Sequence, residues 1–115
     1  MFRASLLIMK HQESLYRTSW KDPEGHIINK TTKENAVALL KALRKDIVSG
    51  KARFEDVASR FSDSDTAKRG GVMGLWMRGQ LPKELEDAAF ALKGFEISEV
   101  LENFDGDVFI IQRTG

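Results

Sequence analysis

The stretch from Phe61 to Leu81 constrains the fold most, because no continuous helix or strand accommodates its composition. It contains four of the chain's nine glycines, at positions 70, 71, 74 and 79, beside bulky apolar residues. Such a cluster predicts backbone that turns sharply and lets another group approach closely. Acidic and hydroxyl side chains at positions 62–66 would then converge near an apolar wall, as in a ligand pocket. A purely structural glycine-rich connection is the alternative.

The bulk properties indicate one ordinary domain. The chain has 115 residues, of which 42% are apolar and 30% charged, and these values are typical of a single globular core. Its net charge of +1 gives no argument for binding nucleic acid or an anionic membrane. It has no cysteine, which excludes disulfides and thiolate catalysis. No long apolar run or signal-peptide pattern is present, so we expect a monomer in the cytoplasm or nucleus.

Two segments have the composition of central strands. Residues 2–9 and 108–112 are dense in apolar side chains, which predicts burial on both faces. We expect them to lie side by side at the centre of one sheet. Residues 96–102 alternate as a further strand, and Asp105-Gly106 predicts a hairpin turn between it and the last strand.

Three helices are predicted between these strands. A capping box that starts at Thr31 opens the first, and Gly50 ends it as a left-handed cap. Residues 53–61 form a second, shorter amphipathic helix. The third follows Pro82 and ends at Gly94. Strands and helices in this order predict an α+β domain.

The polar segment 12–31 is predicted to be a long surface loop. Loops of roughly 20 residues are uncommon in compact domains and are often functional. Tyr16 and Trp20 lie within it, and one or both are expected to pin the loop to the body of the domain.

The residues by themselves exclude several chemistries. His11 and His26 lack metal-site spacing, and Ser62 and Ser64 lack the context of an activated nucleophile. No phosphate-binding loop is present, and the basic cluster near residue 68 is too small to indicate nucleic-acid binding. Chemistry without a cofactor remains, such as rotation about a prolyl peptide bond, whose barrier is about 20 kcal/mol. The residues alone do not choose between this reaction and peptide binding.

Several motifs agree in order along almost the whole chain: Ser-Trp-Lys-Asp-Pro-Glu-Gly at 19–25, Asp-Ile-Val-Ser-Gly-Lys-Ala at 46–52, Phe-Ser-Asp…Ala-Lys-Arg-Gly-Gly at 61–71, Arg-Gly-Gln at 78–80 and Glu-Asp-Ala-Ala-Phe-Ala-Leu at 86–92. With them the chain resembles the parvulin-type peptidyl-prolyl cis–trans isomerases. More narrowly, it is similar to the plant single-domain relatives of the phosphoserine/threonine-proline-specific branch, which lack a WW domain. The resemblance implies one domain over 1–115 with the order β-α3-β-α-β2. It also implies a four-stranded antiparallel sheet covered by four helices, a short strand near Val72–Trp76, and no cofactor.

The resemblance also assigns the site. The proline ring would be held by Met73, Leu81 and Leu85, the last of which is usually Phe in the family. The residues that match catalytic or pocket-side positions are Asp63, Ser64, Asp65 and Gln80. Lys10 and Arg17 would be the remaining cations that contact substrate. The implied partners are proline-containing peptides or proteins.

Three departures from the family pattern set the functional expectation. Ser64 stands where the family has an active-centre cysteine, and Leu6 and Phe109 replace its paired buried histidines. Leu15 and Tyr16 replace the basic pair that grips phosphate. We therefore expect non-covalent isomerisation of X-Pro bonds, weakened and with reduced phosphate preference. The alternatives are a proline-peptide-binding module without catalysis and an engineered or degenerate scaffold.

Overall fold

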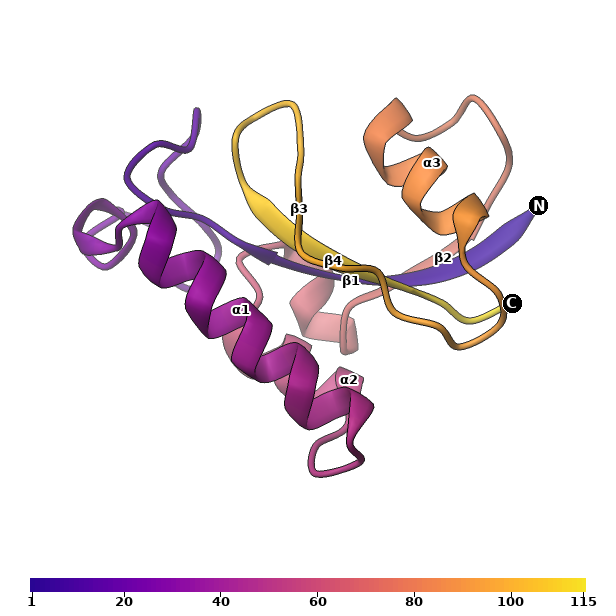
Figure 1. The fold of residues 1–115 in the computed structure, drawn as a ribbon. Helices are drawn as coiled ribbons and strands as arrows, with labels where there is room; N and C mark the ends of the chain where they lie inside the picture. Colours follow the sequence, from indigo (N-terminus) through magenta and orange to yellow (C-terminus); the bar gives the residue numbers. More distant parts are fainter.

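The computed structural model describes all residues from 1 to 115 and contains one four-stranded antiparallel sheet. The strand order is β2-β1-β4-β3 (Figure 1). The strands are β1 (Phe2–Met9), β2 (Val72–Trp76), β3 (Leu101–Glu102) and β4 (Val108–Arg113). The prediction that the first and last strands lie together at the sheet centre is confirmed. The short strand implied by the family resemblance is β2.

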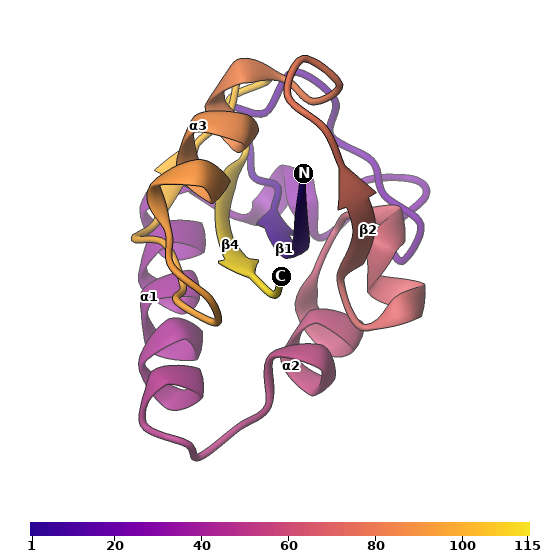
Figure 2. The same ribbon diagram turned by 90° about the vertical axis from the view of Figure 1, so that its right-hand side faces the viewer.

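The helices cover both faces of this sheet. They are α1 (Lys33–Val48), α2 (Phe54–Phe61), α3 (Lys83–Ala91) and two 3₁₀ helices, Ile28–Lys30 and Asp65–Arg69. Figure 1 shows α1 and α2 on one face and α3 on the other, and Figure 2 shows β2 at the sheet edge beside the second 3₁₀ helix. Of the four helices expected, three are α-helical, and the remaining one corresponds to the 3₁₀ helix at 65–69. No helix has both the length and the apolar content that crossing a membrane requires.

The two faces of the sheet carry separate apolar cores, because side chains alternate along β1 and β4. Leu7 and Ile110 belong to the core beneath α1 and α2, whereas Leu6 and Phe109 belong to the core beneath α3. Burying one such side chain contributes about 1.5–3 kcal/mol. The core beneath α3 reaches the glycine-rich stretch of the chain, which places the candidate site over that face.

The start of α1 differs by one residue from the predicted capping box. The hydroxyl of Thr32 accepts the backbone N–H of Asn35 at 3.0 Å, so Thr32 is the N-cap. The hydroxyl of Thr31 instead donates to the carbonyl of Ile27 at 2.8 Å. Thr31 was therefore the wrong cap, because its side chain is used to close the preceding 3₁₀ turn. Gly50 has a φ of 82° and follows α1 as predicted.

The end of α3 and the strand after it also differ from the prediction. Gly94 does not cap α3, which ends at Ala91. Arg113 donates to the carbonyl of Leu92 at 3.0 Å and draws the chain toward β4. The predicted strand 96–102 is interrupted: Leu101–Glu102 forms a ladder with β4, and Ile97 contributes only an isolated bridge to Gln112. The guanidinium of Arg44 donates hydrogen bonds to the carbonyls of Ile97 and Ser98, in the earlier part of this segment. These bonds limit ladder formation there.

Candidate active site

A fully buried serine joins the end of β1 to the glycine-rich stretch. The Ser62 hydroxyl accepts the backbone N–H groups of Ile8 at 3.1 Å and of Ser64 at 3.2 Å. The N–H of Asp63 donates to the carbonyl of Ile8 at 2.8 Å. These bonds fix where the second 3₁₀ helix starts relative to the sheet. Ser62 was not among the predicted site residues, because its role depends on a partner 54 positions away.

Asp63 lies at the same junction and is buried, with both carboxylate oxygens engaged. Its Oδ2 accepts the N–H of Lys10 at 2.8 Å, and its Oδ1 accepts the Ser19 hydroxyl at 2.9 Å. The ammonium of Lys21 lies 3.6 Å from Oδ1. Because its oxygens are satisfied inside the protein, the geometry gives Asp63 a role in positioning the long loop.

Ser64 is half-buried and caps the second 3₁₀ helix. Its Oγ accepts the N–H of Thr66 at 3.3 Å and lies 2.9 Å from the Thr66 hydroxyl. When Thr66 donates to Ser64, the Ser64 proton is free to donate to a ligand. The neighbouring Asp65 is exposed in the first turn of the same helix.

The residues predicted to hold the proline ring lie in or against the core beneath α3. Leu85 is buried and belongs to that core, and Met73 and Leu81 are half-buried and pack against it. Leu6 and Phe109, at the family's histidine positions, are 4% and 0% exposed in the same cluster. At these two positions the floor is therefore hydrocarbon instead of imidazole.

Gln80 lies in the exposed turn between β2 and α3. Its Oε1 accepts the N–H of Met77 at 2.8 Å, which leaves its Nε2 group without a partner in the protein. Glu86 braces the same turn: it is buried and accepts the N–H of Gly79 at 2.9 Å. Arg78 lies 4.2 Å above the ring of Phe90 and 3.8 Å from Glu86. These bracing contacts were not predicted from the sequence, because the charged residues of this turn have the pattern of an ordinary exposed surface.

The predicted substrate cations do not form a clamp. Lys10 is half-buried, and Arg17 is exposed and donates to the carbonyl of Gln12 at 3.3 Å. The side chains of Leu15 and Tyr16 are 60% and 62% exposed. Trp20 pins the loop as predicted, because its Nε1 donates to the carbonyl of Ser62 at 3.0 Å. Tyr16 has no comparable role.

The rest of the long loop is organised by a buried carboxylate. Oδ2 of Asp22 accepts the N–H groups of Ile27 at 3.0 Å and Ile28 at 2.9 Å. The bond from Ile28 is the main reason that the pKa of Asp22 lies below its ordinary value.

A separate ion pair connects α1 to β3. The ammonium of Lys33 donates to the carboxylate of Glu102 at 2.9 Å, and this bond raises the pKa of Lys33.

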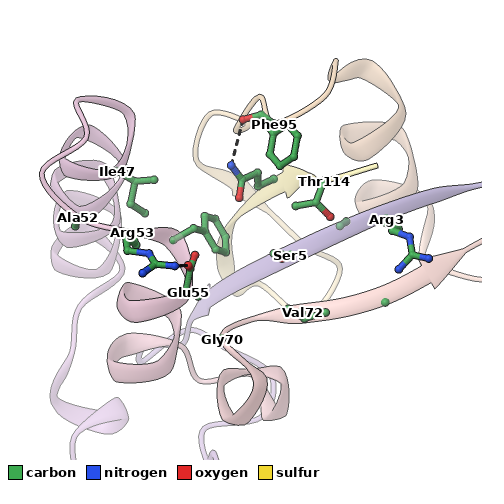
Figure 3. A pocket seen from close by; sticks show the side chains of 14 residues that line it. Arg3, Ser5, Ile47, Ala52, Arg53, Glu55, Gly70, Val72, Phe95 and Thr114 are labelled. Carbon is green, nitrogen blue, oxygen red and sulfur yellow. Dashed lines mark hydrogen bonds and ion pairs between the residues drawn. The ribbon is translucent and has the colours of Figure 1, made fainter.

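The largest cavity lies on the opposite face of the sheet and contains none of the predicted site residues. It has a volume of about 680 Å³ and opens between the start of α2 and the ends of β1 and β4 (Figure 3). Some of its polar groups are paired with one another: Arg53 with Glu55, and the Gln112 amide with the carbonyl of Phe95. We place the candidate site over the other face, where the residues predicted to hold the proline ring lie in or against one core.

Comparisons with known proteins show the family of the chain. The family model of the rotamase, PPIC-type PPIase domain matches residues 19–111. Two plant proteins named peptidyl-prolyl cis-trans isomerase Pin1 are each 54% identical to this chain. The one from Malus domestica covers 98% of this chain and 93% of its own length, and the one from Arabidopsis thaliana covers 97% and 93%.

A solved structure supports the fold directly. The peptidyl-prolyl isomerase ESS1 from Candida albicans superposes with a TM-score of 0.90 at 36% identity, over 99% of this chain and 62% of that one. The family model, the plant relatives and the fold therefore lead to the same assignment: the chain belongs to the PPIC-type, or parvulin-type, family of peptidyl-prolyl cis–trans isomerases.

Proposed function

We propose how this peptidyl-prolyl cis–trans isomerase works: it holds the proline ring in an apolar pocket and donates a hydrogen bond to the rotating amide. The observation that carries the proposal is the packing of Met73 and Leu81 over a buried hydrocarbon floor. Substrate prolines would lie on this surface, away from water. Half-buried Ser64 and the free amide of Gln80 are the candidate donors around it.

The chemistry of the reaction suits these groups. Rotation must overcome about 20 kcal/mol, most of which is lost amide resonance. Twisting leaves a lone pair on the proline nitrogen, which accepts a hydrogen bond better than the planar amide does. A donor aimed at that nitrogen, together with exclusion of water, therefore stabilises the twisted amide more than the planar one.

A covalent route has little support in the site. Ser64 bonds to Thr66, and no histidine is bonded to it. The buried His11 is engaged instead with the carbonyl of Gly106 and the N–H of Glu13. A serine without an adjacent base is a weak nucleophile. We therefore assign Ser64 a hydrogen-bonding role, and we expect weaker catalysis than in relatives that retain the family's cysteine and histidines.

Phosphate is expected to matter little to substrate choice. A charge-assisted bidentate clamp contributes about 1.5–3 kcal/mol for each hydrogen bond to a charged group. Here apolar Leu15 and Tyr16 are exposed at the positions of that clamp, and Arg17 is used to hold the loop. Lys10 by itself provides only a point charge.

The test is NMR exchange spectroscopy on Glu-Pro and phosphoserine-Pro peptides, with and without the protein. We expect cis–trans exchange with both, and rates that agree within about tenfold, which corresponds to about 1.4 kcal/mol. Ser64→Ala should slow exchange, whereas Asp56→Ala, at an exposed position of α2 on the opposite face of the sheet, should not. Peptide-induced shifts at Met73 and Leu81 without exchange would show a binding module instead of an enzyme.

A further inference from the structure

Phe104 is the most exposed large apolar side chain in the molecule, at 91%, and it lies in the turn between β3 and β4. An isolated exposed aromatic needs no explanation in a mobile loop. The backbone of this turn is instead closely held. The N–H of Gly106 donates to the carbonyl of Asn103 at 3.0 Å, and the N–H of Asp107 donates to the Asn103 side chain at 3.0 Å.

Neighbouring elements hold the same turn from two sides. On one side, Glu84 of α3 accepts the N–H of Phe104 at 2.9 Å. On the other, the carbonyl of Asp105 accepts the N–H of Leu15 at 2.8 Å, and the carbonyl of Gly106 lies 2.7 Å from Nε2 of buried His11. Figure 1 shows this turn projecting on the face that carries α3. The exposed ring is therefore presented by a braced backbone, which lowers the entropy lost on binding.

A cavity of about 380 Å³ separates this turn from the start of α3. Phe104 and Leu85 are its large apolar walls. Leu85 also belongs to the apolar cluster beneath the proline pocket, so one residue contributes to both spaces. A peptide with its proline over that cluster would extend a flanking side chain toward Phe104.

The charges around the cavity disfavour an anionic occupant. Glu84 and Asp105 line it together with a single cation, Lys83. Glu84 is held in place by its bond to the N–H of Phe104, so its charge stays at the cavity wall. A phosphate or acidic side chain would meet more negative than positive charge there, whereas an apolar side chain would cover the exposed ring.

We propose that Phe104 and Leu85 form a subsite for a large apolar or aromatic side chain that flanks the substrate proline. The proposal rests on the proposed function, since it names the substrate class of the same site. Leu15, whose backbone N–H is bonded to Asp105 of the same turn, also has an exposed apolar side chain. Phe104 is thus a specificity residue that replaces charge recognition by apolar contact.

The experiment measures exchange rates for acetyl-Ala-Xaa-Pro-Ala-amide peptides in which Xaa is Phe, Leu, Ala or Glu. A second series places Phe after the proline. The variants are Phe104→Ala and, as a matched control, Phe95→Ala. Phe95 is 71% exposed and lines the cavity on the opposite face of the sheet (Figure 3). Dissociation constants for the same peptides are taken from backbone shift titrations.

We expect kcat/KM for the best Phe peptide to exceed that for the Ala peptide by about fivefold or more, from burial of an aromatic side chain. Phe104→Ala should bring the two within about twofold, with the Ala peptide and the Phe95→Ala variant little changed. Equal rates for Phe and Ala peptides in the unaltered protein would overturn the subsite. So would a loss in Phe104→Ala that is the same for every peptide.

The two proposals fail in different ways. If no peptide undergoes exchange, the proposed function is wrong. The dissociation constants then test whether the subsite exists. Tighter binding of the Phe peptide that disappears in Phe104→Ala would support it. Equal binding of all peptides, or no binding at millimolar concentration, would overturn it.

Discussion

Asp63 accepts a hydrogen bond from the backbone N–H of Lys10 at 2.8 Å, across 53 positions of the chain. The same carboxylate also accepts the hydroxyl of Ser19, so one side chain connects the end of β1, the long loop and the start of the 3₁₀ helix at 65–69. This junction holds the long loop and the segment that carries Ser64 against the end of β1.

Replacing Asp63 should therefore destabilise the fold. Asp63→Ala leaves a largely buried backbone N–H without its acceptor and should lower the free energy of unfolding by about 1–3 kcal/mol. The exposed neighbour provides the control, since Asp65→Ala should change stability by less than about 0.5 kcal/mol. Urea denaturation of both variants measures the difference. Equal effects would show that the junction is not what stabilises this region.

Two glycines allow the cost of a left-handed backbone to be measured apart from the cost of close packing. Gly71 has a φ of 86°, and a Cβ there would lie 2.6 Å from the carbonyl oxygen of Leu6 and 3.0 Å from the Cβ of Ala58. Gly74 has a φ of 90°, but a Cβ there would meet nothing within 4 Å. Gly74→Ala should cost about 1–2 kcal/mol from the left-handed backbone alone. Gly71→Ala should cost clearly more, because β1 or α2 must move; similar losses by thermal or urea unfolding would contradict this.

The apolar floor predicts how the protein responds to histidines. Leu6→His or Phe109→His by itself places a polar ring among hydrocarbon and should cost about 2–4 kcal/mol. Leu6 pairs with Ile111 and Ile8 pairs with Phe109, so the two positions are diagonal neighbours on one face. Two histidines there can bond to each other.

A double-mutant cycle measures that coupling. The double variant should be more stable than the sum of the two single losses predicts, by about 0.5 kcal/mol or more. Strict additivity in urea denaturation would mean that the rings do not meet. The exchange rate of a Glu-Pro peptide with the double variant also tests whether the hydrocarbon floor limits catalysis.

Asp22 predicts a pH dependence of stability. Its pKa is lowered from 3.8, mainly by the N–H of Ile28 and also by the N–H of Ile27. A lowered pKa in the folded state contributes stability above the unfolded value, and this is lost as the pH falls through the folded pKa. Asp22→Asn should thus be less stable than the unaltered protein at pH 6, and the two should converge below pH 3.8. A difference between the two free energies of unfolding that stays constant from pH 6 to pH 2 in urea denaturation would contradict this.

Local sequence patterns predicted most of the framework. The dense apolar runs at 2–9 and 108–112 placed the central strands correctly, because burial on both faces requires that composition wherever the strands pair. Gly50 ended α1 for the local reason that it adopts a left-handed φ. The errors arose where a distant group supplied the hydrogen bonds: Arg113 at the end of α3, and Arg44 along the segment before β3.

The site was predictable only in part. Motif order identified the family and predicted Met73, Leu81 and Leu85 as pocket residues, all of which the structure places in or against one core. It did not show that the oxygens of Asp63 are used inside the protein, nor that a braced turn exposes Phe104 beside Leu85. These facts depend on contacts between residues far apart in the chain.

By itself, the sequence determined the α+β class, the central strands, the main helices and the family. Each of these follows from side-chain periodicity, turn chemistry or motif order, which act between residues close in sequence. Only the tertiary structure decided which polar groups remain free to contact a substrate. A carboxylate or hydroxyl is available for function only when no buried backbone group has bound it, and its partner at Lys10 or Ile8 is known only once the sheet has formed.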